Sequence, residues 1–172
     1  MRIVLSFMAF IAISTLLQAQ PFSLVKDINQ TSNTFEGSAD RNTEVNGILY
    51  FSALTPTTGQ ELWKSDGTNA GTNMIKDILP GKNGSNPMLI TNVNGTIFLV
   101  AYDGVNGIEL WKTDGTATGT TLVKDIVTGP VGSSIQSMTN VNGTLFYPAN
   151  DNINGSELWK RDGTAAGING KR

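Results

Sequence analysis

The sequence predicts an all-β protein: a β-propeller-like array of about three four-stranded antiparallel blades, following an N-terminal signal peptide. Three observations support this prediction. The chain repeats itself every 48 residues, as its three Trp residues show. Asn-Gly and Asp-Gly turn signals separate short runs rich in β-branched and aromatic residues. After residue 20, no apolar pattern has the period of a helix. A repeat of this length is the usual size of a propeller blade, whereas a β-sandwich, the alternative, does not require a fixed period.

Residues 1–19 have the features of a signal peptide. Arg2 supplies a positive charge, Ile3–Leu17 is an uncharged, mostly apolar run of 15 residues, and polar residues follow. We expect cleavage after Ala19. A membrane anchor is the competing interpretation, but a span needs about 20 apolar residues. We therefore expect a secreted, extracellular or cell-surface protein, with the periplasm as the alternative and no membrane span after cleavage.

The repeat region occupies residues 20–172. A lone strand is expected at 24–28, followed by units at about 37–78, 84–126 and 132–172, the last incomplete because its fourth strand is missing. Each unit carries the string E-L-W-K-x-D-G-T. The signature residues expected to build each blade are Glu61, Trp63, Asp66, Gly67, Glu109, Trp111, Asp114, Gly115, Glu157, Trp159, Asp162 and Gly163.

The second unit shows the expected strands best. Its four runs of strand-forming residues are Met88–Val93, Thr96–Tyr102, Ile108–Thr113 and Thr120–Ile126. Asn94-Gly95 between the first two indicates a type I′ hairpin. Both faces of Thr96–Tyr102 are apolar, whereas a sheet with one wet face alternates apolar and polar residues. This strand is therefore expected to be covered on both sides, as in sheets that pack on one another.

The ends of the array suggest how it is completed. We expect Leu24–Ile28 to pair with the strand that contains Glu157–Lys160, since this would remove an exposed sheet edge. Three blades are few for a closed ring. Either the ring is unusually small, or two copies self-associate to complete it.

Composition excludes several classes of function. The net charge is −2, so no basic field favours nucleic acid as a partner. The chain has no His and no Cys, which rules out Ser-His and Cys-His nucleophiles. We predict that the chain is not an enzyme and has no catalytic, cofactor-binding or metal-ligating residue.

The signature residues allow other interpretations. The Trp residues could stack on a sugar, although their place beside apolar Leu favours filling the gap between blades. The Glu and Asp residues could form glycosidase pairs. Each unit carries the same set, however, which favours turn capping and pairing with Lys64, Lys112 or Lys160. One Asp per Asp-Gly-Thr loop is too few for calcium, so Asp103 with Asn106, or Asp151 with Asn152, would be as plausible a calcium site.

The string E-L-W-K-[ST]-D-G-T-x-x-G-T-x-x-[VI]-K-D-I resembles the ELWxxDGT repeat of exported bacterial proteins. This resemblance implies propeller-like repeats, secretion and, in many members, a C-terminal sorting module of the type IX secretion system. The Asp-Gly-Thr turn also resembles the Asp-box of sialidase-type propellers, in which the Asp side chain holds a hairpin through bonds to the backbone.

These features predict a non-enzymatic module for protein or glycan binding, adhesion or scaffolding. The alternatives are a fragment of a carbohydrate-active propeller enzyme and a truncated remnant without independent activity. A ligand is expected to contact the segments in which the units differ, namely Asn29–Glu36, Thr55–Thr58 and Leu79–Asn83.

Overall fold

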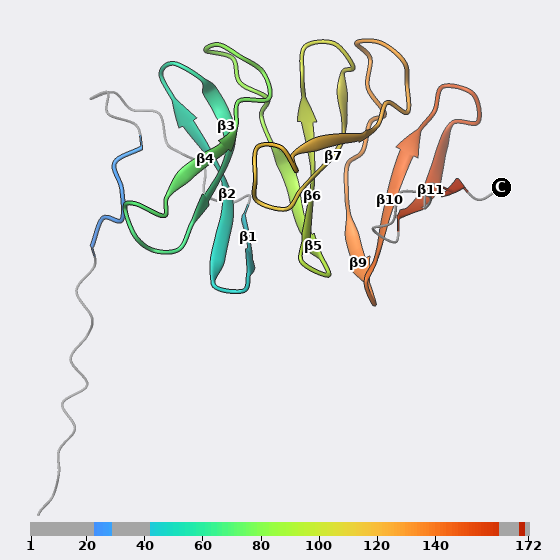
Figure 1. Ribbon diagram of the computed structural model, residues 1–172. Coiled ribbons are helices and arrows are strands. Elements are labelled where there is room, and N and C mark those ends of the chain that lie inside the picture. Colours follow the sequence, from blue (N-terminus) through green and yellow to red (C-terminus); the bar gives the residue numbers. More distant parts are fainter. Residues whose placement is uncertain (1–22, 29–41, 162–168, 171–172) are drawn as a thin grey trace, which may run out of the picture.

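The computed structural model describes residues 23–28, 42–161 and 169–170, and in these ranges the fold is all-β and contains no helix. Three four-stranded antiparallel sheets lie side by side in chain order (Figure 1). The predicted signal peptide, 1–19, and the variable segment 29–36 lie outside these ranges. A search of the described residues found no helix long and apolar enough to cross a membrane.

Each sheet is a meander of four consecutive strands. In chain order, the strands are β1 (Asn42–Val45), β2 (Ile48–Thr55), β3 (Gly59–Ser65), β4 (Asn73–Lys76), β5 (Met88–Val93), β6 (Thr96–Tyr102), β7 (Ile108–Thr113), β8 (Thr121–Lys124), β9 (Thr139–Val141), β10 (Thr144–Asn150), β11 (Ser156–Arg161) and β12 (Asn169–Gly170). The predicted bounds of the first three strands of the second unit are confirmed, and the fourth is shorter than predicted at both ends.

Asn-Gly pairs form the first turn of every sheet. The Asn φ angles are 53° at Asn46, 52° at Asn94 and 50° at Asn142, and the Gly that follows each also has a positive φ angle. Two successive positive φ angles define the hairpin turn that matches the twist of the flanking strands. Asn and Gly adopt positive φ angles at little cost, so these pairs determine where the chain reverses direction after β1, β5 and β9.

The second sheet is buried on both faces. Ile97, Leu99 and Ala101 of β6 belong to the apolar cluster shared with the first sheet. Phe98 and Val100 belong to the cluster shared with the third sheet. All five side chains are 0% exposed. Burying each large one stabilises the fold by about 1.5–3 kcal/mol, so face-to-face packing of neighbouring sheets is the main source of stability.

The predicted pairing of Leu24–Ile28 with the third sheet is wrong. Residues 23–28 form no strand, and the edge of β11 pairs instead with β12, where Trp159 is opposite Gly170 and Lys160 is opposite Asn169. The third unit therefore has a fourth strand, although a short one. Since β12 follows β11 closely in the chain, its pairing closes a much shorter loop than one made by residues 24–28.

The β12 pairing also has the register of the second sheet, where Trp111 is opposite Leu122 and Lys112 is opposite Thr121. In the described ranges, no strand pairs with a strand of another sheet, so the three sheets form an open row (Figure 1).

Candidate functional site

The signature Trp residues lie on the faces of the sheets. Trp111 belongs to the cluster between the first and second sheets, and Trp159 to the cluster between the second and third. The Nζ atoms of Lys76 and Lys124, which end the preceding units' fourth strands, lie 5.9 and 5.4 Å from the centres of these two rings. Trp63 occupies the same position on the outer face of the first sheet. Buried between sheets, Trp111 and Trp159 are not available to a sugar.

Glu61 ties the linker between the first two sheets to β3. Its Oε1 accepts hydrogen bonds from the backbone N–H groups of Leu79 (3.1 Å) and Ser85 (2.8 Å), and its Oε2 accepts one from the Ser85 hydroxyl (2.6 Å). Burial raises the pKa of Glu61 above its ordinary value, although these bonds oppose the rise. The expected pairing with Lys64 is wrong, because Lys64 Nζ donates to the Gly115 carbonyl of the next unit at 2.8 Å.

Glu109 has the same place in the second unit but fewer bonds. Its Oε1 accepts from the Val127 N–H at 3.3 Å. Its Oε2 and the Ser133 hydroxyl have no hydrogen-bond partner in the described part of the chain. Burial raises the pKa of Glu109 too. Glu61 and Glu109 are 0% exposed, whereas Glu157 is half-buried. A carboxylate enclosed in this way holds the linker and is closed to a substrate.

The signature Asp residues fold the turn that precedes the fourth strand. Asp66 Oδ1 accepts from the N–H (2.9 Å) and the hydroxyl (2.7 Å) of Thr68, and the Thr68 hydroxyl accepts from the Gly71 N–H at 2.9 Å. Asp114 and Thr116 repeat the first two distances. The Thr68 hydroxyl is the main reason that the pKa of Asp66 is lowered. The side chains thus form Asx turns, the arrangement implied by the Asp-box resemblance.

The signature Gly residues supply positive φ angles at these turns, 86° at Gly67 and 88° at Gly115. Asp162 and Gly163, their counterparts in the third unit, lie outside the described residues.

The acidic residues considered for calcium fold the turn between the second and third strands. Asp103 accepts from the N–H groups of Val105 (2.9 Å) and Asn106 (2.8 Å) and from the Asn106 amide (2.6 Å). Asp151 makes the same bonds with Ile153 and Asn154. A search of the described chain found no group of three or more acidic side chains placed to hold a metal ion.

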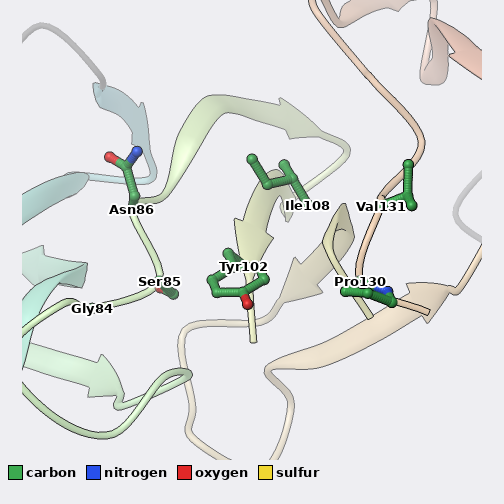
Figure 2. Close-up of a pocket in the computed structure, with 7 residues that line it drawn as sticks. All are labelled: Gly84, Ser85, Asn86, Tyr102, Ile108, Pro130 and Val131. Carbon is green, nitrogen blue, oxygen red and sulfur yellow. The ribbon is translucent and has the colours of Figure 1, made fainter. Parts of the chain in front are cut away.

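A pocket of about 440 Å³ opens at one end of the second sheet. Figure 2 shows Tyr102 and Ile108 between the linker that precedes the sheet and the linker that follows it. Backbone bonds fix the first linker, since Asn86 N donates to Gln60 O at 3.0 Å and Tyr102 N to Ser85 O at 2.9 Å. The lining contains no charged side chain and consists of Gly84, Ser85, Asn86, Tyr102, Ile108, Pro130 and Val131.

The pocket lies where the repeat units differ. Counting 48 residues in each direction, Tyr102 corresponds to Leu54 and Asn150, and Ile108 to Gln60 and Ser156. Differences between the units predicted the neighbouring segment Leu79–Asn83 as a ligand contact, but not Tyr102 or Ile108. An alignment of the three units at these two positions could have identified them, because an aromatic and an apolar residue there occur together only in the second unit.

A second pocket, of about 510 Å³, lies on the outer face of the first sheet. It brings the variable turn Thr55–Thr58 together with Trp63, Met74 and Ile28. In this pocket, the signature residue Trp63 lies beside Thr55–Thr58, a segment in which the units differ.

Comparison with protein-family models, with curated proteins and with solved structures gave no match to this chain.

Proposed function

We propose that this chain is an exported, non-catalytic binding module of the ELWxxDGT repeat type, and that the pocket at Tyr102 binds a neutral glycan. The observation that carries the proposal is the pocket's uncharged lining, which combines the ring and hydroxyl of Tyr102 with apolar side chains and backbone groups. Sugars present both C–H faces, which pack on aromatic rings, and hydroxyls, which need polar partners. A charged ligand would gain nothing from this lining.

The export and the fold class of this proposal have separate support. The apolar leader at 1–19 supports export. Consecutive four-stranded meanders that pack face to face support propeller blades. The shared E-L-W-K-x-D-G-T string supports the family.

The non-catalytic part of the proposal rests on the carboxylate nearest the pocket. Ser85 lines the pocket, but its hydroxyl donates to Glu61, which is 0% exposed. A general acid or base must reach the proton that it transfers. Glu61 is enclosed by the linker to which it is hydrogen-bonded, so its role is structural.

Binding of neutral oligosaccharides to the purified chain, screened on an array and measured by calorimetry, tests the proposal. We expect Tyr102→Ala to weaken binding by about tenfold or more, the value of one lost ring contact of about 1.4 kcal/mol. Ile108→Ala should weaken it less. Ser156→Ala is the matched control at the repeat position of Ile108 and should bind normally.

Three results would contradict the proposal. These are no binding to any neutral glycan, equal effects of Ile108→Ala and Ser156→Ala, and turnover of the bound glycan. Preferential binding of uncharged peptides would make the module a protein binder instead.

A further inference from the structure

Every sheet of this protein has two unlike faces. We call the side that carries the signature Trp the Trp face, and the side that carries the signature Leu the Leu face. Leu62 of the first sheet and Trp111 of the second share one apolar cluster, and Leu110 of the second and Trp159 of the third share the other. In both internal junctions, therefore, the Leu face of one sheet packs on the Trp face of the next.

The two ends of the row present one face of each kind. The third sheet ends with an outer Leu face, on which Leu158 is 58% exposed, whereas its counterparts Leu62 and Leu110 are 0% exposed. Phe146 on the same face is half-buried, whereas its counterpart Phe98 is fully buried. The side chains of this face therefore match those of an internal junction, but they lie against solvent.

The first sheet begins with an outer Trp face, on which Trp63 is 9% exposed and so nearly as buried as Trp111 and Trp159. Leu49 on this face is 40% exposed, whereas its counterparts Ile97 and Leu145 are 0% exposed. The two end faces thus carry the two halves of the junction that occurs twice inside the molecule.

One part of the outer Trp face is already covered as in an internal junction. Lys26 Nζ donates to the Thr72 carbonyl at 2.7 Å, just as Lys76 Nζ donates to the Thr120 carbonyl at 2.8 Å. Both Lys residues belong to a Lys-Asp-Ile triplet, and Lys76 comes from the preceding sheet. The first sheet therefore binds a segment in the way that the second binds part of the unit before it. Leu49 remains exposed, and in an internal junction the other strands of the preceding unit would cover it.

We infer that two copies of this chain associate head to tail, with the Leu face of the third sheet of one copy on the Trp face of the first sheet of the other. A second copy is the occupant because it carries the complementary face. The same pair of faces already packs together at both internal junctions of the chain. The polar contacts should repeat as well: Lys64 bonds the Gly115 carbonyl across the first junction, so Lys160 should bond the Gly67 carbonyl of the other copy.

A pair of end-blocked variants tests this inference. Leu158→Arg places a charge on the outer Leu face, and Leu49→Arg places one on the outer Trp face. Because both side chains are at least 40% exposed, the substitutions should leave the fold of each copy intact. Ile153→Arg, in a turn and at a side chain 86% exposed, is the matched control.

Sedimentation velocity of the purified chain over a range of concentrations provides the readout. We expect the wild type and Ile153→Arg to associate reversibly, and each end-blocked variant alone to stay monomeric. An equimolar mixture of Leu49→Arg and Leu158→Arg should regain a species of twice the monomer mass, because it restores one intact junction. That recovery also shows that both variants are folded, and thermal melting checks each one alone.

A wild type that is monomeric at every concentration overturns the inference. So does a Leu49→Arg variant that associates by itself, since it would show pairing of two Leu faces. A mixture of two cooperatively melting variants that stays monomeric overturns it as well.

Discussion

The second and third repeat units share the same signature but differ greatly in burial. Leu110 and Glu109 of the second unit are 0% exposed, whereas Leu158 is 58% exposed and Glu157 is half-buried. The two strands have the same neighbours within their sheets, and their register with the following strand is the same. The difference therefore comes from the next sheet, which covers β7 and not β11.

This comparison separates two kinds of interaction. Turns that bond within themselves do not depend on a following sheet, as the identical networks of Asp103 in the second unit and Asp151 in the third show. Contacts of the Leu face and of the signature Glu depend on the following unit. In repeat proteins the stability is close to a sum of unit terms and nearest-neighbour terms, and the signature residues divide between the two.

The largest expected effect is that of truncating the signature Leu. Leu110→Ala should lower the free energy of unfolding by about 3 kcal/mol, because it leaves a cavity between two sheets. Leu158→Ala should cost less than about 1 kcal/mol, because water already reaches that side chain. Urea denaturation at low protein concentration measures both. Equal losses would contradict the dependence on a neighbouring sheet.

Removing the signature Glu should have the next largest effect. Glu61→Ala leaves the buried N–H of Ser85 and the partly buried N–H of Leu79 without their acceptor and should cost about 2 kcal/mol. Glu157→Ala, at the half-buried counterpart, should cost much less, and chemical denaturation compares the two. If Glu61→Ala were harmless, the carboxylate would not be what holds the linker.

The pH dependence of stability should distinguish the same residues. Burial raises the folded-state pKa of Glu61 and Glu109 above their ordinary value of 4.5, so folding favours the protonated forms. Their contribution to stability is fully present below pH 4.5 and is lost as the pH rises through the raised pKa.

Glu109→Gln should flatten this part of the stability profile, measured by thermal melting from pH 4 to pH 7. It should cost little, since an amide oxygen can still accept from the Val127 N–H. If the stability of Glu109→Gln depended on pH as steeply as that of the wild type, burial would not raise the pKa of this carboxyl.

The smallest effect concerns the self-contained turns. Asp103→Ala and Asp151→Ala should each lower the melting temperature slightly and by the same amount, because both side chains accept the same bonds within their own turn. Differential scanning calorimetry can compare them directly. A much larger loss at Asp103 would mean that this turn, too, depends on the next unit.

Local signals in the sequence were sufficient for the strands and turns. The Asn-Gly pairs and the doubly apolar Thr96–Tyr102 gave the strand bounds of the second unit and its burial on both faces. The ends were harder to predict, because the place of Lys26–Ile28 depends on a contact with the turn between β3 and β4 and on the competing strand β12. The role of Glu61 was missed for a similar reason: its partners are backbone groups, which no residue pattern reveals.

Hydrogen exchange of β7 and β11, followed as a function of protein concentration, tests the neighbour dependence of the repeat units most directly. We expect β7 to be strongly protected at every concentration, since its sheet is covered on both sides. Strand β11 should exchange much faster in dilute solution and become protected as the concentration rises, but not in Leu158→Arg. Equal protection of β7 and β11 in dilute solution would contradict the claim that each unit is completed by the sheet that follows it.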